Sequence, residues 1–241
     1  RRRSELGKSF SIYKREVQNY FLSPLAYVIM GLFLLLSGYF FSTYILSTRM
    51  ATMQGAFSNM SLVLLFIVPI LTMRLLAEEQ ARGTEELLLT HPLRLTSMVV
   101  GKYMAAVTLL VFIFVITGFY PMILFIYGSP EVGPIVSGYL GILLMGAASI
   151  AVGVFASSLT ENQIIAALVS FSILLLLWVI SWVANVVPFV SQTIVNSLSI
   201  ISHFSDFSRG VIEVKHIIYY LSVIFVFLFL AIQNIERRRW S

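Results

Sequence analysis

The most constraining feature of this sequence is a series of long stretches that contain no charged residue. A helix that crosses a bilayer needs about 20 mostly apolar residues. Six stretches of about this length lie almost entirely within the charge-free intervals, and we expect each to span a membrane: Leu25–Leu46, Asn59–Leu76, Tyr103–Tyr127, Ile135–Ser158, Gln163–Val183 and Ile217–Ile235. Their apolar residues are continuous rather than alternating, which excludes a β-barrel. The predicted fold is therefore an all-α polytopic membrane protein.

The composition excludes several other classes of protein. The 241 residues are 59% hydrophobic and 11% charged, whereas a soluble domain is about 45–50% apolar and about 25% charged. A water-soluble fold could not bury this much apolar surface, so an ordinary soluble enzyme, a secreted miniprotein and a disordered chain are excluded. The chain has no cysteine, which excludes disulfides, thiolate metal ligands and cysteine catalysis.

The distribution of basic residues predicts the orientation in the membrane. Six spans place both chain ends on one side, together with 13 of the 16 Lys and Arg residues; the others are Arg49, Arg209 and Lys215. Cytoplasmic loops are enriched in Lys and Arg, so we expect a multi-pass protein of the plasma (inner) membrane with both termini in the cytoplasm. The net charge of +5 then reflects orientation, and no nucleic-acid partner is expected.

The first 24 residues form a cytoplasmic amphipathic segment in this prediction, and residues 25–241 form a single six-span domain. Aromatic and apolar residues within Lys8–Leu22 recur at steps of three and four, which places them on one helical face: Phe10, Tyr13, Val17, Tyr20 and Phe21. Ser23-Pro24 then breaks the helix. We expect a helix in the lipid headgroup region, with an exposed N-terminal helix as the alternative.

The loop between the second and third spans, residues 74–102, carries the most informative pattern. Thr84 stands where a helix N-cap would, and Glu85 and Glu86 in the first turn complement the helix dipole. Three leucines follow before His91-Pro92 stops the helix. The pattern predicts a short helix with an acidic start and an apolar body. Its leucines favour a docking site for a soluble partner, with packing against the N-terminal helix as the alternative.

Two other polar stretches interrupt the apolar pattern. The loop after the fourth span is a tight polar turn, and it is either a second, smaller contact or only a turn: Ser158, Thr160, Glu161 and Asn162. Residues 184–216 are too polar for a lipid-exposed span, so we expect one or two short helices on or dipping into the interface.

These pieces resemble the permease subunit of ABC-2-type exporters, and they are most similar to the gliding-motility and copper-maturation permeases. The resemblance rests on the run Ala77–Pro92 followed by Gly101-Lys102-Tyr103. It is supported by Ser157–Gln163 and by a group near the end of the chain: His203, Phe204, Phe207, Arg209, Gly210, Val211 and Ile212.

The resemblance implies a dimer with a second permease subunit, identical or different, and two separate ABC ATPase subunits on the cytoplasmic side. It implies that the helix around Thr84–Thr90 couples the two kinds of subunit. The residues assigned to ATPase coupling are Glu78, Glu79, Arg82, Gly83, Thr84, Glu85, Glu86, Leu87, Leu88, Leu89, Thr90 and Pro92. It also implies that short external helices within Val183–His216 roof the dimer, with His203, Phe204, Arg209 and Gly210 as their marked residues.

The chain contains no phosphate-binding loop of the type that ATPases use. Such a loop needs G-x-x-x-x-G-K-[ST]. Gly101-Lys102 is followed by Tyr103 and preceded at the required position by Thr96, and Gly7-Lys8-Ser9 is preceded at that position by Arg2. We therefore expect no enzymatic activity, cofactor or metal in this chain, with ATP and Mg²⁺ on the partner subunit. Lys102 is interpreted as an anchor at the membrane interface.

Three other functions fit the sequence less well. A secondary transporter coupled to protons or ions usually carries ionisable residues within its spans, but the predicted spans contain only Arg74; an ion-independent secondary transporter is a weaker alternative. An intramembrane protease would fit the pair Glu78-Glu79, but the spacing to Arg82 differs from that motif, and paired glutamates on a charged loop are usually solvated. A membrane scaffold, or a subunit that transmits force without moving a solute, remains the main alternative.

The three histidines do not predict a metal triad, because His91 is expected on the opposite membrane face from His203 and His216. Two prolines, Pro69 in the second span and Pro121 in the third, either kink their helices or are tolerated by packing.

Overall fold

The computed structural model describes residues 13–81, 95–186 and 197–238, and every regular element within them is an α-helix. Six of the described helical segments are long and apolar enough to cross a membrane, which confirms the all-α polytopic prediction. They are Pro24–Thr48, Gln54–Ala81, Leu95–Tyr127, Val132–Ser158, Gln163–Ile180 and Val214–Arg237. The second span is longer than predicted at both ends, and the third begins at Leu95 rather than Tyr103 and so includes Lys102.

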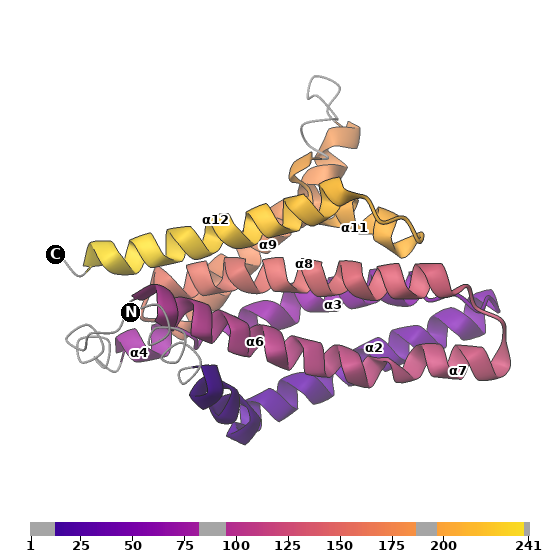
Figure 1. Ribbon diagram of the computed structural model, residues 1–241, viewed down its shortest axis with the longest axis horizontal. Coiled ribbons are helices and arrows are strands. Elements are labelled where there is room, and N and C mark those ends of the chain that lie inside the picture. The colour runs from indigo at the N-terminus through magenta and orange to yellow at the C-terminus, as the bar shows by residue number, and fades with distance from the viewer. Residues whose placement is uncertain (1–12, 82–94, 187–196, 239–241) are drawn as a thin grey trace, which may run out of the picture.

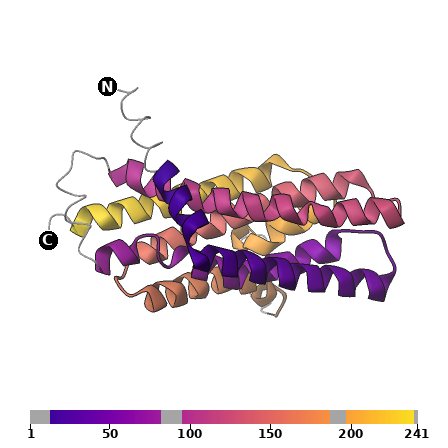
Figure 2. The ribbon, with the colours of Figure 1, turned by 90° about the horizontal axis from the view of Figure 1, so that it is seen from below.

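Helix α8 (Val132–Ser158) lies at the centre of the bundle and is buried along most of its length (Figures 1 and 2). It packs against α3 (Gln54–Thr72), α6 (Leu95–Thr117), α9 (Gln163–Val186) and α12 (Val214–Arg238). Small residues let membrane helices approach closely. Gly153 is the clearest case, because a Cβ there would lie 2.1 Å from Thr72 Oγ1 of α3.

Two of the spans are interrupted near a proline. The second span divides at residues 73–76 into α3 and α4 (Ala77–Ala81), shortly after Pro69. The third divides at Gly118 into α6 and α7 (Phe119–Tyr127), just before Pro121. Proline has no N–H to bond the carbonyl four residues earlier, and the Thr117 carbonyl instead accepts a 2.7 Å hydrogen bond from the Tyr139 hydroxyl of α8. Both prolines therefore accompany breaks in their helices.

The two described ends of the chain lie at the same end of the bundle. Residues 13–22 form a helix that ends before Ser23, and Pro24 begins α2 (Pro24–Thr48), as the sequence predicts. The Tyr13 hydroxyl lies 3.0 Å from Thr108 Oγ1, and the Tyr20 hydroxyl donates to the Leu71 carbonyl at 3.4 Å. The polar face, with Lys14, Arg15 and Gln18, is exposed. The C-terminal end of α12 lies at this end of the bundle too, where Asn234 donates a hydrogen bond to the Ser158 carbonyl of α8 (Figure 1).

A short helix, α11 (Ile200–Ser208), precedes α12 and packs against α8. Ser199 caps its N-terminus by accepting a hydrogen bond from the Ser202 N–H at 3.3 Å. Gly210 follows the helix with a φ of +95°, a conformation that favours glycine. The prediction of a short helix within residues 184–216 is thereby confirmed at α11.

Candidate functional site

The candidate site is the stem of the loop that follows the second span. The chain leaves the bundle through α4 and returns through α6. Lys102 belongs to α6 and is buried, with only 4% of its surface exposed. Its Nζ lies 2.8 Å from Glu79 Oε1 of α4 and 3.6 Å from Glu16 Oε1 of the N-terminal helix. A buried ammonium group requires such anionic partners. The three ionic side chains therefore join three separate segments.

The start of α4 is held by a serine from α8. Ser157 Oγ accepts hydrogen bonds from the backbone N–H groups of Leu76 and Ala77, each at 3.0 Å, and donates to the Met73 carbonyl at 3.1 Å. The first N–H groups of a helix have no partner within it. Ser157 thus caps α4 from a neighbouring helix and fixes the turn that separates α4 from α3.

The last residue of α8 connects α4 to α12. The Ser158 carbonyl accepts hydrogen bonds from Gln80 Nε2 of α4 at 3.3 Å and from Asn234 Nδ2 of α12 at 2.6 Å. Both partners are side-chain amides from segments far apart in the sequence. Ser157 and Ser158 therefore fasten the stem to the central helix and to the final span at one point.

The loop after α8 is a tight turn, as the sequence predicts. The Asn162 N–H donates to Thr160 Oγ1 at 3.1 Å, and Asn162 Oδ1 accepts from Ile164 N–H at 2.9 Å and Ile165 N–H at 3.4 Å. Asn162 is thus the N-cap of α9. Glu161 is exposed beside it. This turn adjoins Ser158 and therefore lies next to α4.

The arrangement is suited to transmitting force rather than to acid–base chemistry. The ionic side chains of Glu79 and Glu16 both pair with Lys102, and the serines bond the backbone. A displacement of α4 would reach α6 and the N-terminal helix through Lys102, and α8 and α12 through Ser157 and Ser158. Burial also raises the pKa of Tyr20, whose hydroxyl joins this region, well above its usual range, with the nearby Glu16 carboxylate adding to the shift.

The structure corrects two sequence interpretations. Lys102 is not an interfacial anchor, because its side chain is buried in an ionic cluster inside the bundle. Glu79 is not solvated, because it is partly buried and paired with Lys102; Glu78 precedes it in the first turn of α4. The remaining predicted coupling residues lie outside the described residues: Arg82, Gly83, Thr84, Glu85, Glu86, Leu87, Leu88, Leu89, Thr90 and Pro92.

Glu16, Ser157 and Asn234 complete the stem. The sequence interpretation assigns no role to Glu16 or Asn234, and it includes Ser157 only in the polar turn after the fourth span. A signal existed for Glu16, since it lies three residues after Tyr13 and four before Tyr20, on the helical face that packs inward. Asn234 and Ser157 gave none, because a polar residue near a span end has no distinctive pattern.

The predicted external residues lie at α11 and the connection to α12. Phe204 is buried, Arg209 is the exposed C-cap of α11, and Gly210 leads into the connection. His203 Nδ1 lies 2.6 Å from His216 Nδ1 of α12, so two of the three histidines do meet, while His91 lies outside the described residues. Burial lowers the pKa of His203, opposed by its hydrogen bond to the Ser197 carbonyl.

No family model matches this chain, and no curated protein does either.

Proposed function

We propose that this chain is the transmembrane subunit of an ATP-driven ABC exporter. In this proposal it pairs with a second permease subunit and is driven by separate ABC ATPase subunits that bind ATP and Mg²⁺. The observation that carries the proposal is the stem of the 82–94 loop, where Lys102, Ser157 and Ser158 fasten α4 to the bundle. The sequence resemblance supports the same assignment.

The mechanism requires force to pass from a soluble motor to the membrane helices. The motor would press on the segment Thr84–Thr90, which follows α4 in the sequence. Movement of α4 would then reach α6 through the Glu79–Lys102 ion pair and α8 through Ser157. A coupled system needs two global states that the partner biases, and the breaks at residues 73–76 and at Gly118 are suitable points of bending.

The distribution of ionisable groups supports this function over proton- or ion-coupled transport. In the described spans the charged groups lie in the first or last third of the span, as Arg74, Lys102 and Lys215 do. Proton-driven transporters usually carry such groups deeper within their spans. ATP hydrolysis by a partner subunit is therefore a better-supported energy source for this bundle than a proton or ion gradient.

The orientation follows from the same proposal. The loop, the N-terminal helix and the end of α12 would face the cytoplasm, where ATP is available, in a plasma (inner) membrane. The basic residues at this end of the bundle support that placement.

The test is to purify the tagged chain from its native membranes and measure the bound ATPase activity. Glu85→Lys and Glu86→Lys, made singly and together, reverse the charge at the start of the predicted coupling helix and should abolish association or stimulated turnover. Glu236→Lys is the matched control, because Glu236 is exposed at the same end of the bundle and should retain both. Unchanged association and turnover in the double variant would refute the docking role.

A second measurement separates transport from force transmission. Both functions predict a bound ATPase, but only an exporter moves a solute across vesicles that contain the purified complex. ATP-dependent coupling without such movement would favour the force-transmitting subunit.

A further inference from the structure

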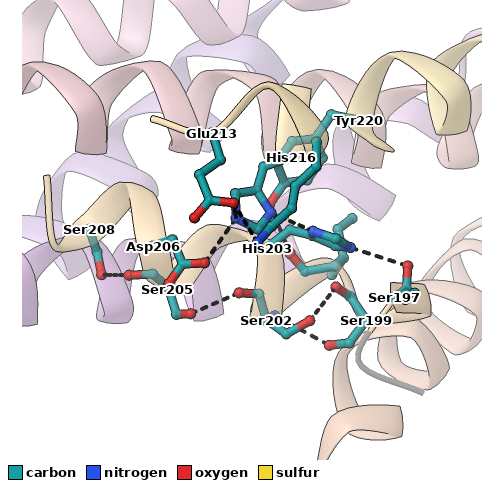
Figure 3. Close-up of polar contacts among 12 residues, drawn as sticks. Ser197, Ser199, Ser202, His203, Ser205, Asp206, Ser208, Glu213, His216 and Tyr220 are labelled. Carbon is teal, nitrogen blue, oxygen red and sulfur yellow. Dashed lines mark hydrogen bonds and ion pairs between the residues drawn. The ribbon is translucent and has the colours of Figure 1, made fainter. Parts of the chain in front are cut away.

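Three side chains that bind metals in other proteins converge where α11 passes into α12 (Figure 3). Asp206 belongs to α11, Glu213 to the connection and His216 to the first turn of α12. Asp206 Oδ2 lies 2.9 Å and Glu213 Oε2 4.0 Å from His216 Nε2, and one ligand atom from each of the three residues lies within 4.8 Å of the other two. This cluster is distant from the stem and has no part in the proposed coupling.

The His216 nitrogen that faces the two carboxylates is buried without a hydrogen bond. The side chain is 4% exposed, and among the described residues no hydrogen-bond partner satisfies Nε2. Asp206 Oδ2 lies 2.9 Å from Nε2, but the contact does not meet the geometry of a hydrogen bond. A metal ion bound to Nε2 could take that oxygen as a second ligand.

The other side of the His216 ring is held by a partner that fixes its tautomer. His203 Nε2 faces the Ser197 carbonyl at 3.1 Å and must donate to it, because a carbonyl only accepts. Neutral His203 therefore accepts at Nδ1, and His216 donates its Nδ1–H across the 2.6 Å contact. This leaves the lone pair of neutral His216 at Nε2, directed toward the carboxylates. Metal-binding histidines are commonly oriented by such a hydrogen bond.

We propose that Asp206, Glu213 and His216 bind a divalent transition-metal cation that clips α11 to the start of α12. Zinc bonds to nitrogen and oxygen ligands are about 2.0–2.2 Å long, so tetrahedral ligand atoms lie about 3.4 Å apart. The 2.9 Å and 4.0 Å separations lie on either side of that value. Glu213 is partly exposed and closes the small remaining gap. Lys215, an exposed side chain that pairs with the same Glu213 oxygen, is displaced when the ion binds.

The donor set selects the class of ion. Mg²⁺ and Ca²⁺ prefer sites made of oxygen ligands, whereas an imidazole with carboxylates suits Zn²⁺ and its neighbours among the transition metals. Two carboxylates and a neutral imidazole also balance the charge of one divalent cation. Zn²⁺ is therefore the probe, and Mg²⁺ is the ion expected not to compete.

The experiment uses the full chain, purified in detergent and stripped with a chelator. Titration with Zn²⁺, followed by calorimetry and elemental analysis after gel filtration, should give one tightly bound ion per chain that excess Mg²⁺ does not displace. Asp206→Asn, Glu213→Gln and His216→Gln should each weaken Zn²⁺ binding at least 10-fold. Glu131→Gln is the matched control, because Glu131 is an exposed carboxylate at the start of α8, near the same end of the bundle, and should bind Zn²⁺ as the unaltered chain does.

Two results would overturn the proposal. One is a monodisperse unaltered chain that binds no stoichiometric Zn²⁺, which would mean that a proton on His216 satisfies the cluster. The other is displacement of Zn²⁺ by Mg²⁺ at similar concentration, a readout that needs no variant to fold. Neither result depends on the ATPase, so failure here is distinguishable from failure of the exporter proposal.

Discussion

Replacing Lys102 with methionine tests the ionic cluster at the stem directly. Methionine keeps an unbranched chain of similar length but removes the charge. Lys102 Nζ is 2.8 Å from Glu79 and 3.6 Å from Glu16, and the side chains of these glutamates are only 18% and 11% exposed. Removing one partner of a buried ion pair costs about 3–5 kcal/mol, because the remaining charge is left uncompensated. We expect Lys102→Met to lower the free energy of unfolding by about that amount.

The assay is reversible unfolding of the purified chain in mixed micelles with increasing SDS, followed by circular dichroism. For soluble chains of 150–250 residues, each kcal/mol shifts the melting temperature by about 2–4 °C, so a parallel thermal scan in detergent should show a loss of about 6–20 °C. Arg15→Met is the matched control. It removes a cation 3.5 Å from the same Glu16, but Arg15 is 61% exposed, so the expected cost is about 0–1 kcal/mol.

A second substitution separates charge from packing. In Lys102→Met with Glu79→Gln, the carboxylate stranded by the first change is also removed, so the double variant should be more stable than the sum of the single changes predicts. The expected coupling is about 1–3 kcal/mol. A loss below about 1 kcal/mol in Lys102→Met, or strict additivity in the double variant, would refute the cluster as the joint of the stem.

Three further substitutions test other contacts. Ser157→Ala removes the oxygen that caps α4 and should lower the unfolding free energy by about 1–3 kcal/mol, whereas Ser149→Ala, which loses only a bond within its own helix, should change it by about 0.5 kcal/mol or less in the same SDS titration. Gly153→Ala should lower the melting temperature by several degrees through its clash with Thr72, while Gly31→Ala, which meets no neighbouring atom within 4 Å, should leave it unchanged or raised. Tyr139→Phe leaves the Thr117 carbonyl without its 2.7 Å donor and should cost about 1 kcal/mol; an unchanged melting curve would mean that water replaces the hydroxyl.

The spans could be predicted because their signal is local. Each depends on about 20 consecutive apolar residues, which suffice to cross a bilayer whatever they pack against. The predicted start of the third span is wrong because the prediction used only this local apolar signal. Lys102 looked like the polar boundary of an apolar run, and only its contacts with Glu16 and Glu79, 86 and 23 positions away in the sequence, allow the helix to continue through it.

The contacts of the candidate sites depend on the tertiary fold. Ser157 was predicted only as part of a turn, and nothing in its surroundings distinguishes a serine that caps another helix from one exposed to water. Likewise, the sequence does not predict a metal triad of histidines, because His91 is expected at the opposite membrane face from His203 and His216. Their meeting depends on how α11 turns back against α12, which hydropathy does not describe.

The central position of α8 has a consequence for how the protein is made. Membrane helices generally enter the bilayer in the order of synthesis, and two neighbours of α8, α9 and α12, follow it in the chain. Until α12 arrives, the surface of α8 that it will cover has no helix packed against it. The native arrangement of the first spans therefore becomes secure only when translation is nearly complete, and a chain that stops short of its last helix should be a ready substrate for membrane quality-control proteases.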